Sequence, residues 1–156
     1  MIDLEIPGYG RLYLEHLLLD YNGTLALDGR LLPEAKERLG AVSELLEIRV
    51  VTADTFGTVA KELEGTGVET VILQSPDHTT EKQTILEKLG AEKTVAVGNG
   101  NNDRAMLERA ALGIAVLGEE GCATATLQAG QIVVPSIAVA LDLLLKPGRL
   151  TATLRR

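Results

Sequence analysis

The sequence contains very few sulfur and aromatic side chains. Among 156 residues there are one cysteine, one phenylalanine, three tyrosines and no tryptophan. With Cys122 as the lone cysteine, an intrachain disulfide and a thiolate metal cluster are both excluded. This cysteine usage suits a reducing cytoplasm, where we expect the protein to be located. The shortage of aromatic rings leaves little surface for stacking a base or gripping a partner.

Long apolar runs and an excess of positive charge are also missing. No segment approaches the roughly 20 apolar residues of a membrane helix, and residues 1–5 lack the basic start of a signal peptide. Lys and Arg number 15 against 22 Asp and Glu, which gives a net charge of -7 spread along the chain. We therefore expect no membrane partner and no nucleic-acid partner. Any phosphate site must attract its anion through local groups.

What the sequence does contain is a regular alternation of strand-like and helix-like runs. Six short apolar runs predict parallel strands covered on both faces, at 17–19, 48–51, 70–73, 94–97, 112–116 and 131–134. The segments between and after them predict helices over 33–47, 55–64, 80–89 behind a Thr79 cap, 103–111, 120–128 and 136–145. The fold class is therefore α/β, with a doubly wound, mostly parallel, Rossmann-like sheet.

The chain length fits a single domain spanning residues 1–156. Residues 1–16 predict an N-terminal hairpin, residues 17–145 a core, and residues 146–156 a C-terminal tail that could also be a docked helix. Asp28-Gly29 favours a tight turn, which predicts a small flap just after the first core strand. The spacings between the later polar loops are filled by helices and strands, so no cap domain is expected.

Polar residues gather in four loops that follow predicted strands, at 20–24, 52–54, 75–82 and 98–103. In open α/β sheets, ligands bind beyond the carboxyl ends of the strands, near the point where the strand order reverses. These loops are therefore the candidate functional site.

The first of these loops, Asp20-Tyr21-Asn22-Gly23-Thr24, resembles the first signature of haloacid dehalogenase phosphatases. Thr52 at a strand end, Lys82 at a helix start and the loop 98–103 match the other three signatures in order and spacing. The resemblance covers roughly residues 17–145. The stretch 82–145 looks especially similar to the phosphorylation domain of P-type ATPases, so the closest description is a soluble, cap-less, P-type ATPase-like hydrolase.

The resemblance implies a role for each matching position. Asp20 would attack phosphorus and form an aspartyl-phosphate, with Asn22, Thr52 and Lys82 as the other catalytic positions. The phosphate would be bound by Asn22, Gly23, Thr52, Ala53 and Lys82. Mg²⁺ would be the cofactor, held by Asp20, the backbone carbonyl of Asn22, Asn99 and Asp103. The implied activity is hydrolysis of a small phosphorylated substrate.

Each of these positions also has a simpler structural interpretation. Asp20 could cap its own loop, and Asp103 could be the N-cap of the following helix. Lys82 could be a solvated surface lysine, with Lys88 and Lys93 as nearby alternatives. Asp54 could match an acidic residue of P-type ATPases or cap the helix that begins near residue 55. His16 and His78 show no metal-ligand spacing, and neither is assigned a role.

Two asparagines depart from the hydrolase pattern. Asn22 stands where most of the phosphatases have an acid/base aspartate, and an amide cannot exchange a proton at neutral pH. Loss of such help typically costs about 10² to 10⁴ in rate, so substrates with good leaving groups should suffer least. Asn99 replaces a usual metal-binding aspartate, which should weaken Mg²⁺ binding. Both precede glycine, so deamidation could restore the two carboxylates.

Three functions follow as alternatives. The first is a Mg²⁺-dependent phosphohydrolase, which Asn22 would slow. The second is a phosphate- or nucleotide-binding regulatory module with little or no turnover. The third is an assembly subunit in which the loops are a relic of the fold. Because a cap-less site lies open, a dimer or tetramer of the chain could cover it.

Overall fold

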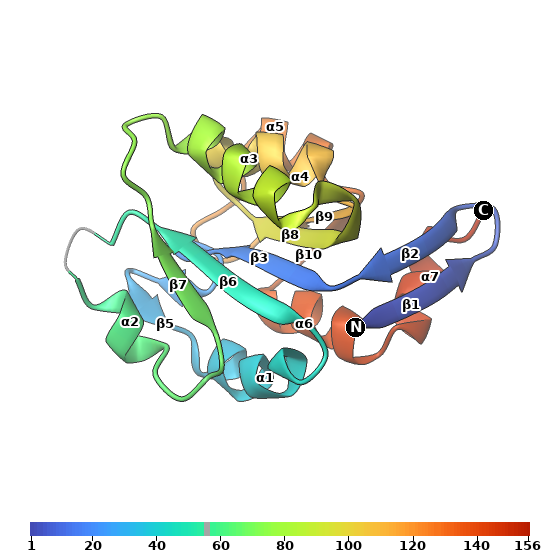
Figure 1. Ribbon diagram of the computed structural model, residues 1–156, viewed down its shortest axis with the longest axis horizontal. Helices are drawn as coiled ribbons and strands as arrows, with labels where there is room; N and C mark the ends of the chain where they lie inside the picture. Colours follow the sequence, from blue (N-terminus) through green and yellow to red (C-terminus); the bar gives the residue numbers. More distant parts are fainter. Residues whose placement is uncertain (55–56) are drawn as a thin grey trace.

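The computed structural model describes residues 1–54 and 57–156 (Figure 1). A central sheet contains six strands: β3 (His16–Asp20), β6 (Glu47–Thr52), β7 (Glu69–Ile72), β8 (Thr94–Gly98), β9 (Leu112–Val116) and β10 (Ile132–Val134). Their order is β10-β9-β8-β3-β6-β7, and all neighbours are parallel. The predicted doubly wound sheet is confirmed. The chain moves outward from β3 through β6 and β7, then returns to β8, so the switch point lies between β3 and β8.

Helices cover both faces of this sheet (Figure 1). One face carries α3 (His78–Leu89), α4 (Arg104–Arg109) and α5 (Thr124–Ala129), and the other carries α1 (Pro33–Ser43) and α6 (Ile137–Leu145). The short helix α2 (Val59–Glu62) precedes β7. Two 3₁₀ turns, η1 (Ala91–Lys93) and η2 (Asn101–Asp103), flank β8.

The alternation of side chains along β3 divides the core into two layers. Leu17 and Leu19 are buried in the cluster beneath α1 and α6, whereas Leu18 is buried with Leu86 and Met106 on the face of α3 and α4. Successive residues of a strand point to opposite faces, so a strand between two helix layers must be apolar at every position. This burial fixes β3 and therefore the position of Asp20 at its end.

Several helix boundaries differ from the prediction. The first helix ends at Ser43 rather than at residue 47, because Glu47 pairs with β3 as the first residue of β6. The third is capped by Asp77 rather than Thr79, since Asp77 Oδ1 accepts from the Thr80 N–H at 3.1 Å. Thr55 and Phe56, where the second helix was predicted to start, lie outside the described residues, and α2 spans Val59–Glu62.

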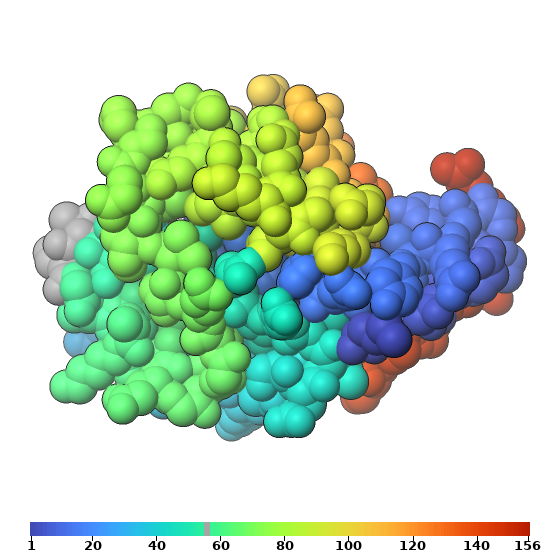
Figure 2. Space-filling model, viewed as in Figure 1, coloured from blue at the N-terminus to red at the C-terminus, as the bar shows by residue number. Residues whose placement is uncertain are grey.

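Two small hairpins flank the core, as the sequence predicts. The N-terminal one pairs β1 (Ile2–Ile6) with β2 (Gly10–Leu14) and projects from one end of the molecule (Figures 1 and 2). The flap pairs β4 (Ala26–Leu27) with β5 (Arg30–Leu31). Its turn residues Asp28 and Gly29 have φ of 51° and 78°, the two positive values that a type I′ turn requires.

The C-terminal segment, whose state the sequence left open, contains a docked helix. Helix α7 (Gly148–Leu154) buries Leu150 and Leu154 in the same cluster as the apolar side chains of the N-terminal hairpin. The Arg156 N–H donates to the Pro7 carbonyl at 3.1 Å, which joins the chain end to the hairpin turn. Among residues 1–54 and 57–156, no helix is long and apolar enough to cross a membrane.

Candidate active site

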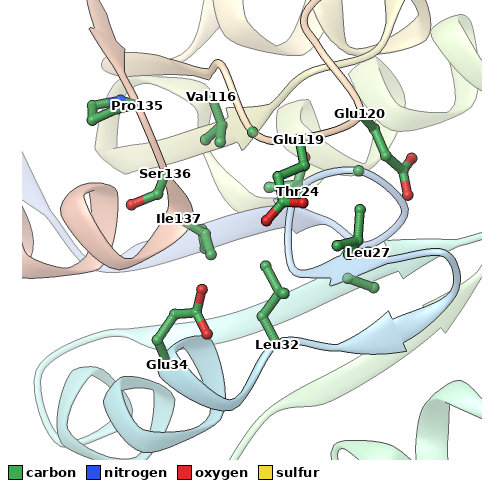
Figure 3. Close-up of a pocket in the computed structure, with 13 residues that line it drawn as sticks. Thr24, Leu27, Leu32, Glu34, Val116, Glu119, Glu120, Pro135, Ser136 and Ile137 are labelled. Atoms are coloured by element: carbon green, nitrogen blue, oxygen red, sulfur yellow. The ribbon is translucent and has the colours of Figure 1, made fainter.

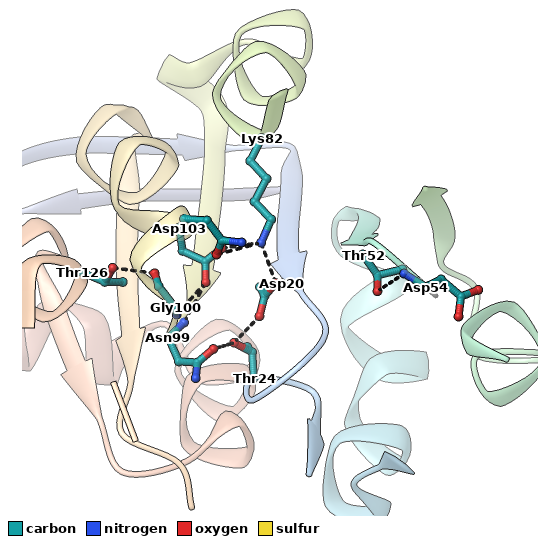
Figure 4. A network of polar contacts seen from close by, with 10 residues as sticks. Asp20, Thr24, Thr52, Asp54, Lys82, Asn99, Gly100, Asp103 and Thr126 are labelled. Atoms are coloured by element: carbon teal, nitrogen blue, oxygen red, sulfur yellow. Dashed lines mark hydrogen bonds and ion pairs between the residues drawn. The ribbon is translucent and has the colours of Figure 1, made fainter. Parts of the chain in front are cut away.

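Three charged side chains meet at the switch point of the sheet (Figure 4). Asp20 ends β3, Asp103 ends the 3₁₀ turn that follows β8, and Lys82 reaches down from α3. Lys82 Nζ lies 2.6 Å from Asp20 Oδ1 and 2.7 Å from Asp103 Oδ1. All three side chains are buried. One ammonium group therefore joins two carboxylates that come from loops 83 positions apart (103 − 20).

The two other lysines considered from the sequence lie elsewhere. Lys88 is exposed on α3, and Lys93 pairs with Glu15 at 2.5 Å. Glu15 immediately precedes the amino end of β3, whereas Asp20 is at its carboxyl end. Tertiary structure therefore places Lys82, and neither alternative, against Asp20.

Asp103 is held by backbone groups of its own loop. Its Oδ2 accepts from the Asn99 N–H at 3.0 Å and from the Gly100 N–H at 2.9 Å. A Cβ atom on Gly98 would lie 2.5 Å from Asp103 Cγ, so only glycine leaves room for the carboxylate to fold back. Asp103 occupies the N-cap position of α4, but its side chain makes no capping bond there. The carboxylate is directed to the site instead.

Thr24 links the first loop to the last, a role that sequence analysis did not assign. Its hydroxyl lies 3.1 Å from Asp20 Oδ2 and 3.2 Å from Asn99 Oδ1, and its single proton is shared between these two acceptors. Asn99 Nδ2 donates to the Gly121 carbonyl at 3.0 Å, which turns the amide oxygen toward Thr24. A Cβ atom on Gly23 would lie 2.4 Å from that amide nitrogen. The Gly-Thr pair of the first motif was the signal in the sequence. Gly23 lets the Asn99 amide come close to the first loop, and Thr24 forms a hydrogen bond with it.

Four of the remaining predicted residues, Asn22, Thr52, Ala53 and Asn99, line one cavity with this cluster. Its walls are formed by Asp20, Asn22, Thr52, Ala53, Leu73, His78, Lys82, Asn99, Gly100 and Asn102. Thr52 is buried at the end of β6, whereas Asn22 and Ala53 are exposed. Gly23, the fifth predicted phosphate-binding residue, is buried and lines a different cavity, so the structure does not bring it to this one. The structure therefore brings together the four predicted loops, and it adds His78 and Asn102, which the sequence did not single out.

Asp54 has a clear structural role. Its Oδ1 accepts from the Thr58 N–H at 3.0 Å and from the Val59 N–H at 3.3 Å, at the start of α2. Its own N–H donates to Thr52 Oγ1 at 3.1 Å, which orients that hydroxyl oxygen. Asp54 thus caps the helix, one of the two interpretations that the sequence left open. Together with Asp28 it also lines a neighbouring cavity that shares Asn22 and Thr52 with the first.

The two Asn-Gly pairs differ in exposure. Asn99 is buried, its amide is bonded to Gly121, and the Gly100 N–H that would have to attack it donates to Asp103. These contacts oppose deamidation at Asn99. Asn22 is exposed, although the Gly23 N–H donates to the Ala26 carbonyl at 3.0 Å. The structure therefore opposes deamidation at Asn99, so it does not support the restoration of both carboxylates.

Burial and like charge make Asp20 an unusual carboxyl group. Burial, followed by the nearby charge of Asp103, raises the pKa of Asp20 from 3.8 to about 7, against the opposing effect of Lys82. Burial alone would lower the pKa of Lys82, but the charges of Asp20 and Asp103 outweigh it and raise that pKa above 10.5. Lys82 therefore remains charged at neutral pH, while Asp20 is poised to exchange a proton.

The oxygen donors at this point fit a small hard cation. Across the described residues, no three side chains of the His, Cys, Asp and Glu types form a metal cage. Mg²⁺ nevertheless needs only one or two carboxylates, because it keeps several waters and takes further oxygens from substrate phosphate. Asp20 and Asp103 supply the carboxylates, and the Asn99 amide oxygen faces the same space through Thr24. The donor set thus suits Mg²⁺ better than a softer metal.

A second cavity lies on the other side of the Gly23-Thr24 turn (Figure 3). Leu27, Leu32 and Ile137 contribute apolar walls, and Glu34 and Glu119 point carboxylates toward it. No lysine or arginine stands among the described residues that line it. A phosphate group would therefore be repelled there, so the cavity that contains Lys82 is the better candidate for a phosphate site.

The raised pKa of Asp20 predicts a pH dependence of stability in the metal-free protein. The unfolded chain loses this proton near pH 4 and the folded chain near pH 7, so the stability that the Asp20 proton contributes is fully present below about pH 4 and is lost as pH rises through 7. In EDTA we expect unfolding temperatures to be higher at pH 5 than at pH 8. Mg²⁺, which binds the ionised form, should stabilise the protein more at pH 8. Equal unfolding temperatures at both pH values in EDTA would contradict this account.

Comparisons with known proteins agree with this geometry. A family model for haloacid dehalogenase-like hydrolases matches residues 77–121, the segment that carries Lys82, Asn99 and Asp103. Over this segment the chain is similar to haloacid dehalogenase-like hydrolases. Two sequence relatives are uncharacterised proteins of Methanocaldococcus jannaschii. MJ0073 is 50% identical over 78 residues (47% of this chain, 84% of that protein), and MJ0072 is 49% identical over 39 residues (25% and 89%).

Solved structures of the superfamily share the fold. The 3-deoxy-D-manno-octulosonate 8-phosphate phosphatase of Moraxella catarrhalis, in complex with magnesium, phosphate and KDO, has a TM-score of 0.72 and 18% identity, with 90% of this chain and 92% of that chain covered. The cobalt-bound phosphatase of Haemophilus influenzae has a TM-score of 0.72 and 13% identity, with coverage of 89% and 91%. The matches cover about nine tenths of each chain, so this chain shares the fold of these phosphatases over most of its length.

Proposed function

We propose that this chain is a Mg²⁺-dependent phosphatase that acts on small phosphorylated substrates through an aspartyl-phosphate on Asp20. The observation that carries this proposal is the position of Lys82 Nζ, within 2.7 Å of both Asp20 and Asp103 at the switch point of the sheet. A buried cation between two carboxylates is costly unless the charges serve a ligand or a reaction. The match of residues 77–121 to a family model of haloacid dehalogenase-like hydrolases supports the same conclusion.

Each residue of the site has a separate proposed role in the reaction. Lys82 keeps one oxygen of Asp20 fixed and Thr24 holds the other, so the carboxylate is oriented for attack on phosphorus. The Thr52 hydroxyl, oriented by the Asp54 N–H, faces the cavity as a donor for a phosphate oxygen. Mg²⁺, held by Asp20, Asp103 and Asn99, would neutralise charge on the phosphate when bound. The Ala53 N–H and the backbone at Asn22 are proposed to complete the phosphate site.

The direct test is release of inorganic phosphate from aryl and acyl phosphates, with Mg²⁺ and then with EDTA. We expect release that depends on Mg²⁺ and that returns when Mg²⁺ replaces EDTA. Tight binding of phosphate with no release over many hours would instead favour a regulatory binding module. Asn22 is the observation behind that second candidate, because an exposed amide at the mouth of the cavity cannot transfer a proton.

An acid at position 22 should speed the reaction. Asn22→Asp should raise phosphate release at least about tenfold, toward the 10² to 10⁴ range of general acid–base catalysis. The gain should be larger for alkyl phosphates than for 4-nitrophenyl phosphate, whose leaving group needs little protonation. Asn101→Asp, which places the same change in the loop before α4, is the matched control. An equal gain for both substrates would show that position 22 does not act on the leaving group.

The charge beside the site should select among leaving groups. Asp28 and Asp54 line the adjoining cavity, and none of the described residues around it is basic. We propose that the leaving group occupies this cavity, so the 6-phosphates of glucosamine and glucose should be cleaved faster than that of gluconate. A difference on the order of tenfold is expected, since two unit charges about 4 Å apart in water interact by about 1 kcal/mol. Asp28→Asn should reduce this discrimination, and equal rates for all three would refute it.

Three further features remain proposals: location in the cytoplasm, likeness to P-type ATPases and assembly into a homo-oligomer. The cavity with Asn22 and Ala53 at its mouth is exposed, so a second copy of the chain could cover it. Light scattering of the purified protein tests the assembly, because a monomeric mass at micromolar concentration would exclude it under those conditions.

A further inference from the structure

The proposed reaction needs a proton donor that Asn22 cannot provide. Asp20, Lys82 and His78 are the titratable side chains among the described residues that line the cavity. Asp20 is the proposed nucleophile, and Lys82 is held as a cation by two carboxylates. His78 is the remaining group, and imidazole is the side chain that most often transfers protons in enzymes.

The helix that presents Lys82 also presents His78. His78 is the first residue of α3 and precedes Lys82 by four positions, so both side chains project from one face of the helix. Lys82 reaches the buried Asp20, whereas His78 is only partly buried and lies one turn closer to the helix start. It therefore stands toward the open side of the cavity that would hold the phosphorus and its leaving oxygen, while the rest of the leaving group extends past Asn22 and Thr52 into the adjoining cavity.

The start of α3 is fixed firmly enough to position this imidazole. Asp77 accepts from the Thr80 N–H at 3.1 Å and from the Thr80 hydroxyl at 2.6 Å. Glu81 accepts from the Ser75 N–H at 2.8 Å, which anchors the preceding loop. The charged groups around His78 are thus Asp77, Glu81 and Lys82 on its own segment and Asp20 across the cavity.

We propose that His78 is the acid and base of the reaction in place of the missing aspartate. This inference rests on the proposed phosphatase function. As Asp20 attacks phosphorus and the bond to the leaving oxygen breaks, protonated His78 gives its proton to that oxygen. The neutral imidazole then takes a proton from the water that attacks the aspartyl-phosphate. Phosphate leaves, the Asp20 carboxylate is regenerated, and His78 is protonated again.

The test compares His78→Gln with the wild-type chain. Phosphate release from an alkyl phosphate should fall about 100-fold, the lower end of the effect of a general acid. Release from 4-nitrophenyl phosphate should fall much less, and the limb of the pH–rate profile due to His78 should disappear. His16→Gln, at the opposite end of β3, is the control for loss of a histidine. Thermal unfolding of each variant verifies that the fold persists.

A double-mutant cycle sharpens the result. In the Asn22→Asp background, His78→Gln should change the rate by about threefold at most, because the new aspartate takes over the proton transfer. An unchanged rate for His78→Gln in the wild-type background would overturn the role of His78 and leave the phosphatase proposal intact. An equal loss for alkyl and aryl substrates would overturn its role as the acid toward the leaving oxygen. Absence of turnover in the wild-type chain with every substrate would overturn both.

Discussion

Replacing Asp20 by asparagine should abolish phosphate release while leaving a folded protein. Asparagine keeps the shape of the side chain but cannot act as the nucleophile, so we expect a loss of at least about 10⁴-fold. The same change removes a buried acid whose pKa is raised to about 7 by burial and by Asp103. In EDTA at pH 8, Asp20→Asn should therefore be at least as stable as the wild-type chain.

Phosphate release and unfolding temperature, measured side by side, check this prediction. Asp3→Asn, on the N-terminal hairpin, removes a negative charge far from the cavity and serves as the control. The fall in stability between pH 5 and pH 8 should flatten in Asp20→Asn, because the group responsible has gone. Retention of more than a trace of activity would assign the nucleophile to another residue.

Replacing Lys82 by methionine should destabilise the protein more than any other change considered. Methionine fills most of the space, but it leaves Asp20 and Asp103 buried without their shared cation. Breaking a buried ion pair by removing one partner typically costs about 3 to 5 kcal/mol. The loss should be greatest in EDTA at pH 8 and smaller at pH 5, where Asp20 takes up a proton.

Denaturant unfolding of Lys82→Met in EDTA and in Mg²⁺ tests this expectation. Mg²⁺ should recover part of the lost stability, because it supplies positive charge to the same two carboxylates. Lys88→Met removes an exposed lysine from the same helix and should change stability by less than about 1 kcal/mol. If Lys82→Met unfolded at the same denaturant concentration as the wild type, the buried contacts of Lys82 could not be as described.

Most of the fold could be predicted from local patterns. Leu17, Leu18 and Leu19 are apolar in succession, which only a strand buried on both faces requires, and β3 is such a strand. The Asp28-Gly29 turn could also be predicted, because a turn with two positive φ values favours these residue types. Helix ends were less predictable. Residues near Ser43, where α1 ends, and Gly121, just before α5, make contacts with strands and loops that are distant in the sequence.

The candidate site was only partly predictable. The order of the four loops pointed to Asp20, Thr52, Lys82 and Asp103, because each follows a strand or begins a helix at the expected spacing. The use of Thr24 as a link to Asn99, and the placement of His78 in the same cavity, depend on loops that are far apart in the sequence. A local sequence pattern does not show which distant loops come into contact.

By itself, the sequence determined which residues could carry the chemistry and which strand ends they would follow, because apolar periodicity sets the strands and parallel strands direct their loops to one edge of the sheet. Only the tertiary structure decided which of three lysines meets Asp20, that the Asp103 side chain makes no capping bond to α4, and which histidine lines the cavity beside Lys82. Those choices follow from the order β8-β3-β6 in the sheet and from the packing of α3 upon it. They are long-range contacts, and residue type and spacing do not specify them.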